Sequence, residues 1–173
     1  HAVNNGPVHK FTLDQRISNL QWFIDAGIPY ARTHDAAFYS TYGGEHTVDV
    51  HAIFPDFDKD ANDPESYDFA CTDEYLRVMD AAGVKPFYRL GSKIEHGVKK
   101  YGTVPPKDFY KWSVICEHII RHYTEGWADG FNYDIEYWEV WNEPDCQNAN
   151  GTNPCWQGTE EQFIDMFCIA LKH

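Results

Sequence analysis

The segment YWEVWNEPD, residues 137–145, ends a strand-like run with an amide beside a carboxylate, Asn142 and Glu143. Because side chains alternate along a strand, Glu139, Trp141 and Glu143 are predicted to share one face, with Glu143 at its carboxyl end. A carboxyl group there can act as general acid/base on a glycosidic bond if a second carboxylate lies about 5–5.5 Å away, as the retaining mechanism requires. The neighbouring amide can donate a hydrogen bond to a sugar hydroxyl without adding charge.

Polar residues also follow the other predicted strands. The segments IPYARTHD and VKPFYRLG read as strands, and each contains a proline, an aromatic residue and an arginine. In an α/β barrel the active site forms where strands end and the following loops begin. By this rule the further candidate site residues are Asn4, Asn5, Arg32, His34, Asp35 and Arg89.

Amphipathic helices are predicted between and after these strands. The first two are expected over 12–27 and 72–83, and each ends at a glycine. The third opens at the Pro105–Pro106 pair, and the fourth starts at Thr159 in a capping box closed by Gln162. Alternating strands and helices of this length imply a parallel sheet with right-handed crossovers.

Two architectures fit this alternation, a doubly wound open sheet and a (β/α)8 TIM barrel. No G-x-G-x-x-G or P-loop motif follows a predicted strand, which favours the barrel. A complete barrel needs about 250 residues, whereas this chain shows about four βα units. We therefore expect residues 1–173 to be the N-terminal part of one barrel domain, without its C-terminal half.

The composition limits the class of partner. A net charge of −13 disfavours nucleic acid and anionic membranes, and no apolar run is long enough to cross a bilayer. The chain as given does not begin with a signal peptide, but a leader could already have been removed. Secreted, periplasmic and cytoplasmic locations therefore all stay open. His118 and His122 do not form a zinc-protease motif and are expected on a helix surface, so neither a metal nor another cofactor is predicted.

The five cysteines contain no C-x-x-C pair, which argues against a zinc ribbon. Cys71, Cys116 and Cys168 fall in helix-like runs and are expected to be small core residues. Cys146 and Cys155 bracket a polar loop after Glu143, and a disulfide between them is one of two open alternatives, because it requires an oxidising compartment.

The motif WEVWNEPD resembles the acid/base signature of clan A retaining glycoside hydrolases. A wider set resembles glycoside hydrolase family 39, the group of β-xylosidases and α-L-iduronidases, in family order over nearly the whole chain: VNNGP, RTHD, YDFACTDEYL, KPFYRLG, PPKDFYKW and WQGTEEQF. The resemblance implies that Glu143 is the general acid/base and that Asn142 contacts the 2-hydroxyl of the sugar in subsite −1. By the same resemblance, Arg32 supports the nucleophile and His34 touches that sugar.

Asp35 and Trp141 are further candidates for substrate contact. The nucleophile of the family, a Glu on the seventh strand, has no counterpart in this chain. The expected activity is therefore that of the complete enzyme, retaining hydrolysis of β-xylosides or related plant oligosaccharides. The alternative is a non-catalytic carbohydrate-binding or assembly half-barrel, whose open faces would need the C-terminal half or a second copy as a partner.

Two stretches depart from the family pattern. The loop LGSKIEHGVKKYG, after the third strand, is more polar and more basic than is usual in relatives. Residues 41–69 read as a long, insertion-like loop after the second strand, and a loop of that length is expected to help shape the sugar subsites.

Overall fold

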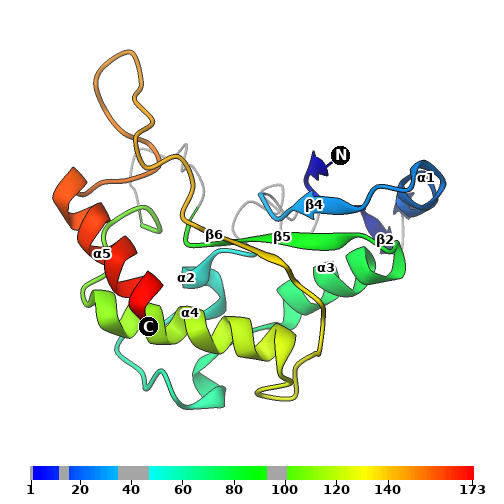
Figure 1. Ribbon diagram of the computed structural model, residues 1–173, viewed down its shortest axis with the longest axis horizontal. Helices are drawn as coiled ribbons and strands as arrows, with labels where there is room; N and C mark the ends of the chain where they lie inside the picture. Colours follow the sequence, from blue (N-terminus) through cyan, green and yellow to red (C-terminus); the bar gives the residue numbers. More distant parts are fainter. Residues whose placement is uncertain (1, 12–15, 35–46, 93–100) are drawn as a thin grey trace.

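A four-stranded parallel sheet organises the computed structural model, which describes residues 2–11, 16–34, 47–92 and 101–173. Neighbouring strands follow one another in chain order and pair in parallel, so every carboxyl end lies at the same edge of the sheet (Figure 1). This pairing confirms the predicted parallel sheet. From one edge to the other, the strands are β1 (Ala2–Asn4), β4 (Tyr30–Arg32), β5 (Lys85–Leu90) and β6 (Tyr137–Val140).

Helices cover one face of this sheet, where the hydrophobic core forms (Figure 1). Alternate strand residues such as Ala31, Tyr88 and Leu90 point into this core and are buried against the apolar stripes of α3 and α4. None of the helices in the described ranges is long and apolar enough to cross a membrane. The helices are α1 (Leu20–Ala26), α2 (Val50–Ile53), α3 (Ala70–Ala81), α4 (Phe109–Thr124) and α5 (Glu160–Lys172), with a 3-10 turn, η1, at Pro64–Ser66.

The opposite face of the sheet carries an aromatic row. Phe87 and Tyr137 stack with ring centroids 5.4 Å apart, and Tyr30 meets the edge of Tyr137 at 5.5 Å. Tyr137 keeps 46% of its surface exposed. Among the described residues this face has no covering layer, unlike the helix-covered face.

The region of the first predicted helix differs from the prediction. Part of it forms instead the strand β3 (Arg16–Ser18), which pairs antiparallel with β2 (His9–Phe11), and α1 begins only at Leu20. Asn19 explains the boundary, because its side-chain oxygen accepts a hydrogen bond from the backbone N–H of Val8 at 2.7 Å and ties the two segments together. Residues 12–15, with which the predicted helix begins, lie outside the described residues.

The other predicted helix ends hold with one exception. Gly27 and Gly83 adopt positive φ after α1 and α3, and Thr159 and Gln162 form the predicted capping box of α5. The exception is α4, which starts after Asp108, whose side chain accepts a hydrogen bond from the N–H of Lys111. A side-chain cap of this kind satisfies a backbone donor, which proline cannot do.

Several burial predictions were wrong. His118 and His122 are buried, with 5% and 2% exposure. Their ring nitrogens find partners inside the core: Nδ1 of His118 bonds the carbonyl of Val114, and the two nitrogens of His122 bond Asp73 and the carbonyl of Trp127. Of the three cysteines predicted in the core, only Cys116 is buried, whereas Cys71 and Cys168 are exposed. Helical periodicity alone did not fix which residues face the core.

Residues 47–69 are more than an exposed loop. Val48, Val50, Ile53 and Phe54 are all buried in the core, and the short helix α2 and the turn η1 lie within this stretch. The prediction of an insertion-like loop is therefore wrong for this part, and residues 41–46 lie outside the described residues.

Gly91 sets the position of the segment after β6. A Cβ at Gly91, whose φ is +109°, would lie 2.6 Å from Cε3 and 3.0 Å from Cα of Trp141. We expect Gly91→Ala to lower the free energy of unfolding by about 2–4 kcal/mol, from the steric clash and the positive φ together. Gly27→Ala, with φ +60° and no atom within 4 Å of the added Cβ, should cost only the conformational part, about 1–2 kcal/mol. Urea unfolding of both variants checks this, and equal losses would contradict the close approach.

Candidate active site

Arg32 joins two strands at the carboxyl edge of the sheet. It is the last residue of β4, and its guanidinium donates to Glu139 of β6 through both Nε (2.6 Å to Oε2) and Nη2 (2.5 Å to Oε1). The same Nη2 donates to Oδ1 of Asn142 at 2.7 Å. The two side chains of the ion pair are about three-quarters buried, with exposures of 25% and 26%, so solvent screens the pair less than a surface pair. A bidentate pair of this kind fixes the plane of the guanidinium.

The amide of Asn142 is held on both sides. Its oxygen accepts from Arg32, and its nitrogen lies 3.8 Å from Sγ of Cys155, a weak acceptor. The residue is only 1% exposed. The charged donor therefore fixes which way the amide points, and the weak sulfur contact leaves donor capacity on the nitrogen.

The backbone turns sharply through the motif. β6 ends at Val140, and Trp141 and Glu143 have positive φ of 70° and 41°, a conformation that costs a residue with a Cβ about 1–2 kcal/mol. Backbone strain of this kind concentrates at functional sites. Glu143 is exposed next to the buried Asn142, so the carboxylate is accessible while its neighbour is fixed.

Trp141 does not share a face with Glu139. Its indole packs between Trp112 of α4 and Trp156, with ring centroids 6.0 Å and 5.1 Å away, and its Nε1 donates to the carbonyl of Cys155 at 2.8 Å. The positive φ at Trp141 ends the alternation of side chains, so Trp141 turns away from the face that carries Glu139. Asn142 lies beside Glu139 instead, in the place that was predicted for Trp141. The predicted sugar contact of Trp141 stays a prediction, and in this structure the side chain is 2% exposed.

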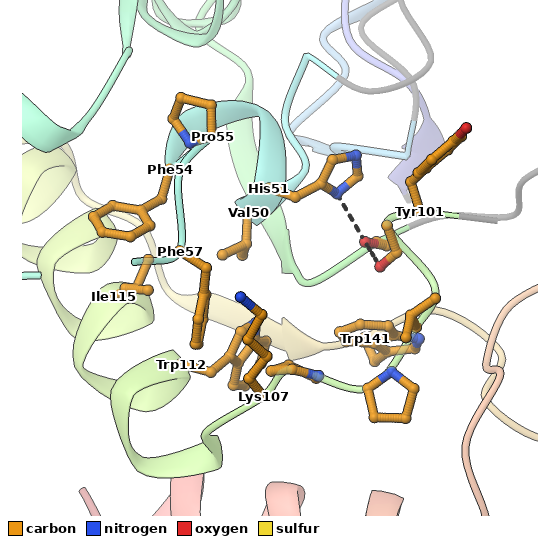
Figure 2. Close-up of a pocket in the computed structure, with 15 residues that line it drawn as sticks. Val50, His51, Phe54, Pro55, Phe57, Tyr101, Lys107, Trp112, Ile115 and Trp141 are labelled. Atoms are coloured by element: carbon orange, nitrogen blue, oxygen red, sulfur yellow. Dashed lines mark hydrogen bonds between the residues drawn. The ribbon is translucent and has the colours of Figure 1, made fainter. Parts of the chain in front are cut away.

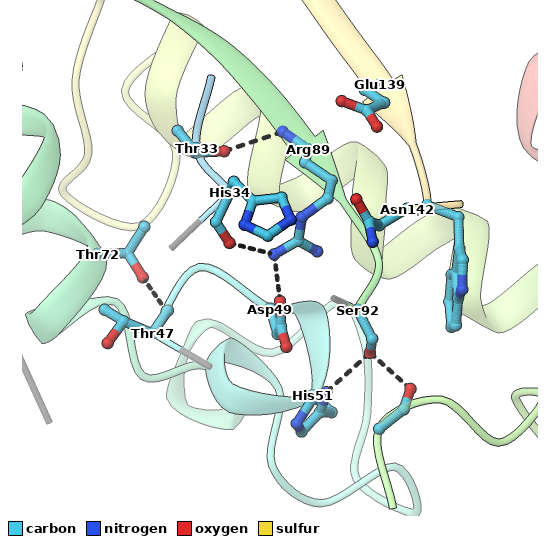
Figure 3. A network of polar contacts seen from close by, with 12 residues as sticks. Thr33, His34, Thr47, Asp49, His51, Thr72, Arg89, Ser92, Glu139 and Asn142 are labelled. Atoms are coloured by element: carbon cyan, nitrogen blue, oxygen red, sulfur yellow. Dashed lines mark hydrogen bonds and ion pairs between the residues drawn. The ribbon is translucent and has the colours of Figure 1, made fainter. Parts of the chain in front are cut away.

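A second polar cluster lies at the end of β5 (Figure 3). Arg89 is fully buried and forms an ion pair with the equally buried Asp49, and its Nη2 also donates to the carbonyl of His34 at 3.3 Å. The cluster thus holds the segment after β4 against β5, which positions His34 close to the site.

The strand-end rule predicted that polar residues gather at the carboxyl edge of the sheet, and the structure shows contacts between several of them. Arg32 bonds Asn142, and Arg89 bonds the carbonyl of His34. The backbone N–H of Asn5 bonds the carbonyl of Arg32 at 3.0 Å. Asp35 lies outside the described residues.

Sequence reasoning missed the roles of Glu139 and Asp49 as partners of the two arginines. Alternation did predict that Glu139 lies on the same face as Glu143, which was the available signal for its contact with Arg32. Asp49 belongs to no recognisable sequence motif, so nothing in the sequence predicted its ion pair with Arg89.

An apolar pocket of about 260 Å³ lies on the helix side of Trp141 (Figure 2). Its walls come from α2, from the start of α4 and from the segment 101–107, and His51 bonds Ser92 at its rim at 3.1 Å. Trp141, which lines the pocket, turns to the helix side of the sheet. The sheet therefore separates the pocket from the Arg32–Glu139 pair.

A groove of about 520 Å³ borders the loop that follows Glu143. Pro144, Asn153 and Trp156 contribute to the loop wall, and Glu160 and Phe163 of α5 contribute to the opposite wall. This groove starts at the residue after the exposed carboxylate, so it is suited to the part of a ligand that extends beyond Glu143.

Cys146 and Cys155 are free thiols in the structure. Their sulfurs and a carboxylate oxygen of Glu143 lie within 4.8 Å of one another, and in the described part of the chain this is the one group with three such potential metal ligands. Burial raises the pKa of the Cys155 thiol to about 12, helped by the nearby Cys146 and Glu143. The thiol of Cys155 is therefore protonated at neutral pH.

Fold and site together define the chain as an α/β protein with a polar site at the carboxyl edge of a parallel sheet. The family model of "Glycosyl hydrolases family 39" matches residues 37–172, so the chain belongs to glycosyl hydrolase family 39. The crystal structure of a glucosidase from Croceicoccus marinus is similar, with a TM-score of 0.79 and 25% sequence identity. The match covers 99% of this chain and 33% of that chain, so the present chain spans about a third of the length of this relative. No curated protein matches the chain.

Proposed function

We propose that Glu143 is the general acid/base of a retaining glycoside hydrolase that acts on β-xylosides or related plant oligosaccharides. The observation that carries this proposal is the contrast between two neighbours at the strand end. Glu143 is exposed and ready to reach a glycosidic oxygen, whereas Asn142 is buried and held by Arg32. Family membership supports the same reaction class.

In the proposed reaction Glu143 first protonates the leaving oxygen while a second carboxylate attacks the anomeric carbon. After the leaving group departs, Glu143 accepts a proton from the water that hydrolyses the glycosyl-enzyme. The amide nitrogen of Asn142 donates to the 2-hydroxyl of the sugar, a hydrogen bond that strengthens as charge develops.

Glu139 is a poor candidate for the attacking carboxylate, because both of its oxygens accept hydrogen bonds from Arg32. We therefore assign the nucleophile to a Glu that follows His173 in the complete protein, at the end of a later strand of the same barrel. Two observations support a larger domain. The aromatic row of Tyr30, Phe87 and Tyr137 is uncovered among the described residues, and the similar glucosidase is about three times as long.

The sugar specificity is proposed from the family resemblance, and the glucosidase neighbour makes glucosides the second candidate. The two sugars differ only by the hydroxymethyl group on C5 of the glucoside, so assays with both test the same site with and without this group. Polar groups that anchor the shared hydroxyls, such as Asn142, would serve both.

Proton NMR of the complete protein with an aryl β-xyloside tests the proposal. We expect the first sugar product to have the β configuration, since two displacements restore the starting stereochemistry. The aryl β-glucoside, assayed in parallel, should be hydrolysed with a lower kcat/KM. An α product, or no hydrolysis of either substrate, would overturn the mechanism, and a preference for the glucoside would overturn the sugar assignment alone.

A further inference from the structure

The loop after Glu143 contains two cysteines that no role in the proposed reaction uses. We propose that Cys146 and Cys155 form a disulfide bond that closes this loop and fixes the groove wall beside the acid/base. The formation of the bond is independent of the proposed function, whereas its effect on turnover rests on that function.

The geometry brings the two sulfurs within reach of each other. They lie within 4.8 Å, and a disulfide needs about 2.05 Å, so the closing movement is at most about 3 Å. A change of rotamer about a single Cα–Cβ bond moves a sulfur by a distance of that order.

The loop between the two cysteines is already folded back on itself. Nδ2 of Asn153 donates to the carbonyl of Pro144 at 2.5 Å, and Oδ1 of Asn153 accepts from the N–H of Cys155 at 2.8 Å. At the loop tip the N–H of Asn148 bonds the carbonyl of Thr152 at 2.8 Å. These bonds hold the two ends of the loop together, which removes most of the ordering that a disulfide would otherwise require.

Both cysteines are attached to the residues of the site. The N–H of Cys146 donates to the carbonyl of Glu143 at 3.0 Å. Cys155 contacts Trp141 through its carbonyl and Asn142 through its sulfur. A bond between the two sulfurs therefore restrains the strained segment 141–143 through these contacts with the loop.

The remaining cysteines offer no competing pair. Cys116 is buried in α4, and Cys71 and Cys168 are exposed on α3 and α5. In the reduced state, Cys146 and Cys155 together with Glu143 offer a thiophilic metal three ligands, and such a metal would occupy the acid/base. The disulfide removes two of these ligands.

The oxidation requires a partner that accepts two electrons. We name a disulfide oxidant, with glutathione disulfide as the probe. The more accessible Cys146 attacks one glutathione sulfur as a thiolate and releases one glutathione, and Cys155 then attacks the mixed disulfide and releases the second. The two thiol protons end on the two released glutathiones, one S–S bond forms in the protein, and one S–S bond is lost from the oxidant.

The tip of the same loop carries the sequence Asn150-Gly151-Thr152, an N-glycosylation acceptor, and Asn150 is exposed. Disulfides and N-linked glycans are both acquired along the secretory route of eukaryotic cells. This second feature agrees with an oxidising environment for the loop.

Peptide mapping of the complete protein without a reductant tests the bond. After equilibration with glutathione disulfide, we expect one linked peptide pair joining Cys146 to Cys155, with the loss of two hydrogens, and its disappearance with dithiothreitol. Cys146→Ser should abolish the pair, and Cys71→Ser, on an exposed helix face, should leave it unchanged. Two free or separately glutathionylated thiols would overturn the proposal.

Hydrogen exchange of residues 147–153, measured with and without dithiothreitol, tests whether the bond fixes the groove wall. Slower exchange in the oxidised protein is expected, and equal exchange rates would overturn this part. In the same samples, kcat/KM should fall by about tenfold on reduction, because the braced segment holds Glu143. An inactive protein that still forms the bond would count against the proposed function, and not against the disulfide.

Discussion

Replacing Glu143 with Gln in the complete protein is expected to lower kcat/KM for alkyl glycosides by about 10²–10⁴-fold, the usual contribution of a general acid. Gln keeps the size of the side chain but cannot give a proton to a poor leaving group. Aryl glycosides with acidic phenols need little protonation, so their first step should be nearly unchanged and the glycosyl-enzyme should accumulate. Steady-state assays on both substrate types, with a burst measurement for the aryl glycoside, check this.

Added azide sharpens the result, because this anion attacks the glycosyl-enzyme without needing a base. It should restore turnover of the aryl glycoside by the variant and yield a glycosyl azide with the β configuration. Glu125→Gln is a matched control, since Glu125 is exposed at the far end of α4, where it pairs with Arg121. Equal rates for the Glu143 variant and the parent on alkyl glycosides would remove Glu143 from the reaction.

Replacing Asp49 with Ala is expected to lower the free energy of unfolding by about 3–5 kcal/mol. The reason is the position of Arg89, which is fully buried and pairs with Asp49 through Nη2. Among the described residues, Nε and Nη1 of Arg89 have no hydrogen-bond partner, so Asp49 provides most of the compensation for a buried positive charge. Removing the carboxylate leaves that charge in a medium of low polarity. Chemical unfolding of the variant and the parent measures the difference.

Asp58→Ala provides the comparison, because Asp58 also pairs with a cation, Lys107, at 3.1 Å. Both of these side chains are largely exposed, so the loss should be at most about 1 kcal/mol. A similarly small loss for Asp49→Ala would mean that Arg89 finds another partner or water. In that case the cluster at the end of β5 would not hold His34 in place.

The sequence predicted the elements whose signals are local. Gly27 and Gly83 end helices because a glycine adopts positive φ without strain, and the Thr159–Gln162 capping box needs only residues three positions apart. Tertiary contacts decided the rest. The hairpin of β2 and β3 replaced part of a helical pattern because Asn19 bonds Val8 across it, a contact that periodicity cannot reveal.

The site followed the same division. Asn142 and Glu143 were predicted as site residues because strand ends at one edge of a parallel sheet meet, whatever lies between them in the chain. The predicted orientation of Trp141 was wrong because the prediction extended the strand alternation past Val140, where the backbone turns to positive φ. That turn depends on the space left by Gly91, directly after the neighbouring strand β5, so it could not be predicted from one strand alone.

The positive φ values at Trp141 and Glu143 also affect how this protein responds to selection. A glycine at either position would relax the backbone, so a library screened only for heat resistance would enrich replacements at position 143. Such winners would lose the carboxylate together with the strain. Directed evolution of this protein should therefore hold residues 141–143 constant and look for stabilising changes elsewhere, for instance on the exposed faces of α1 and α5.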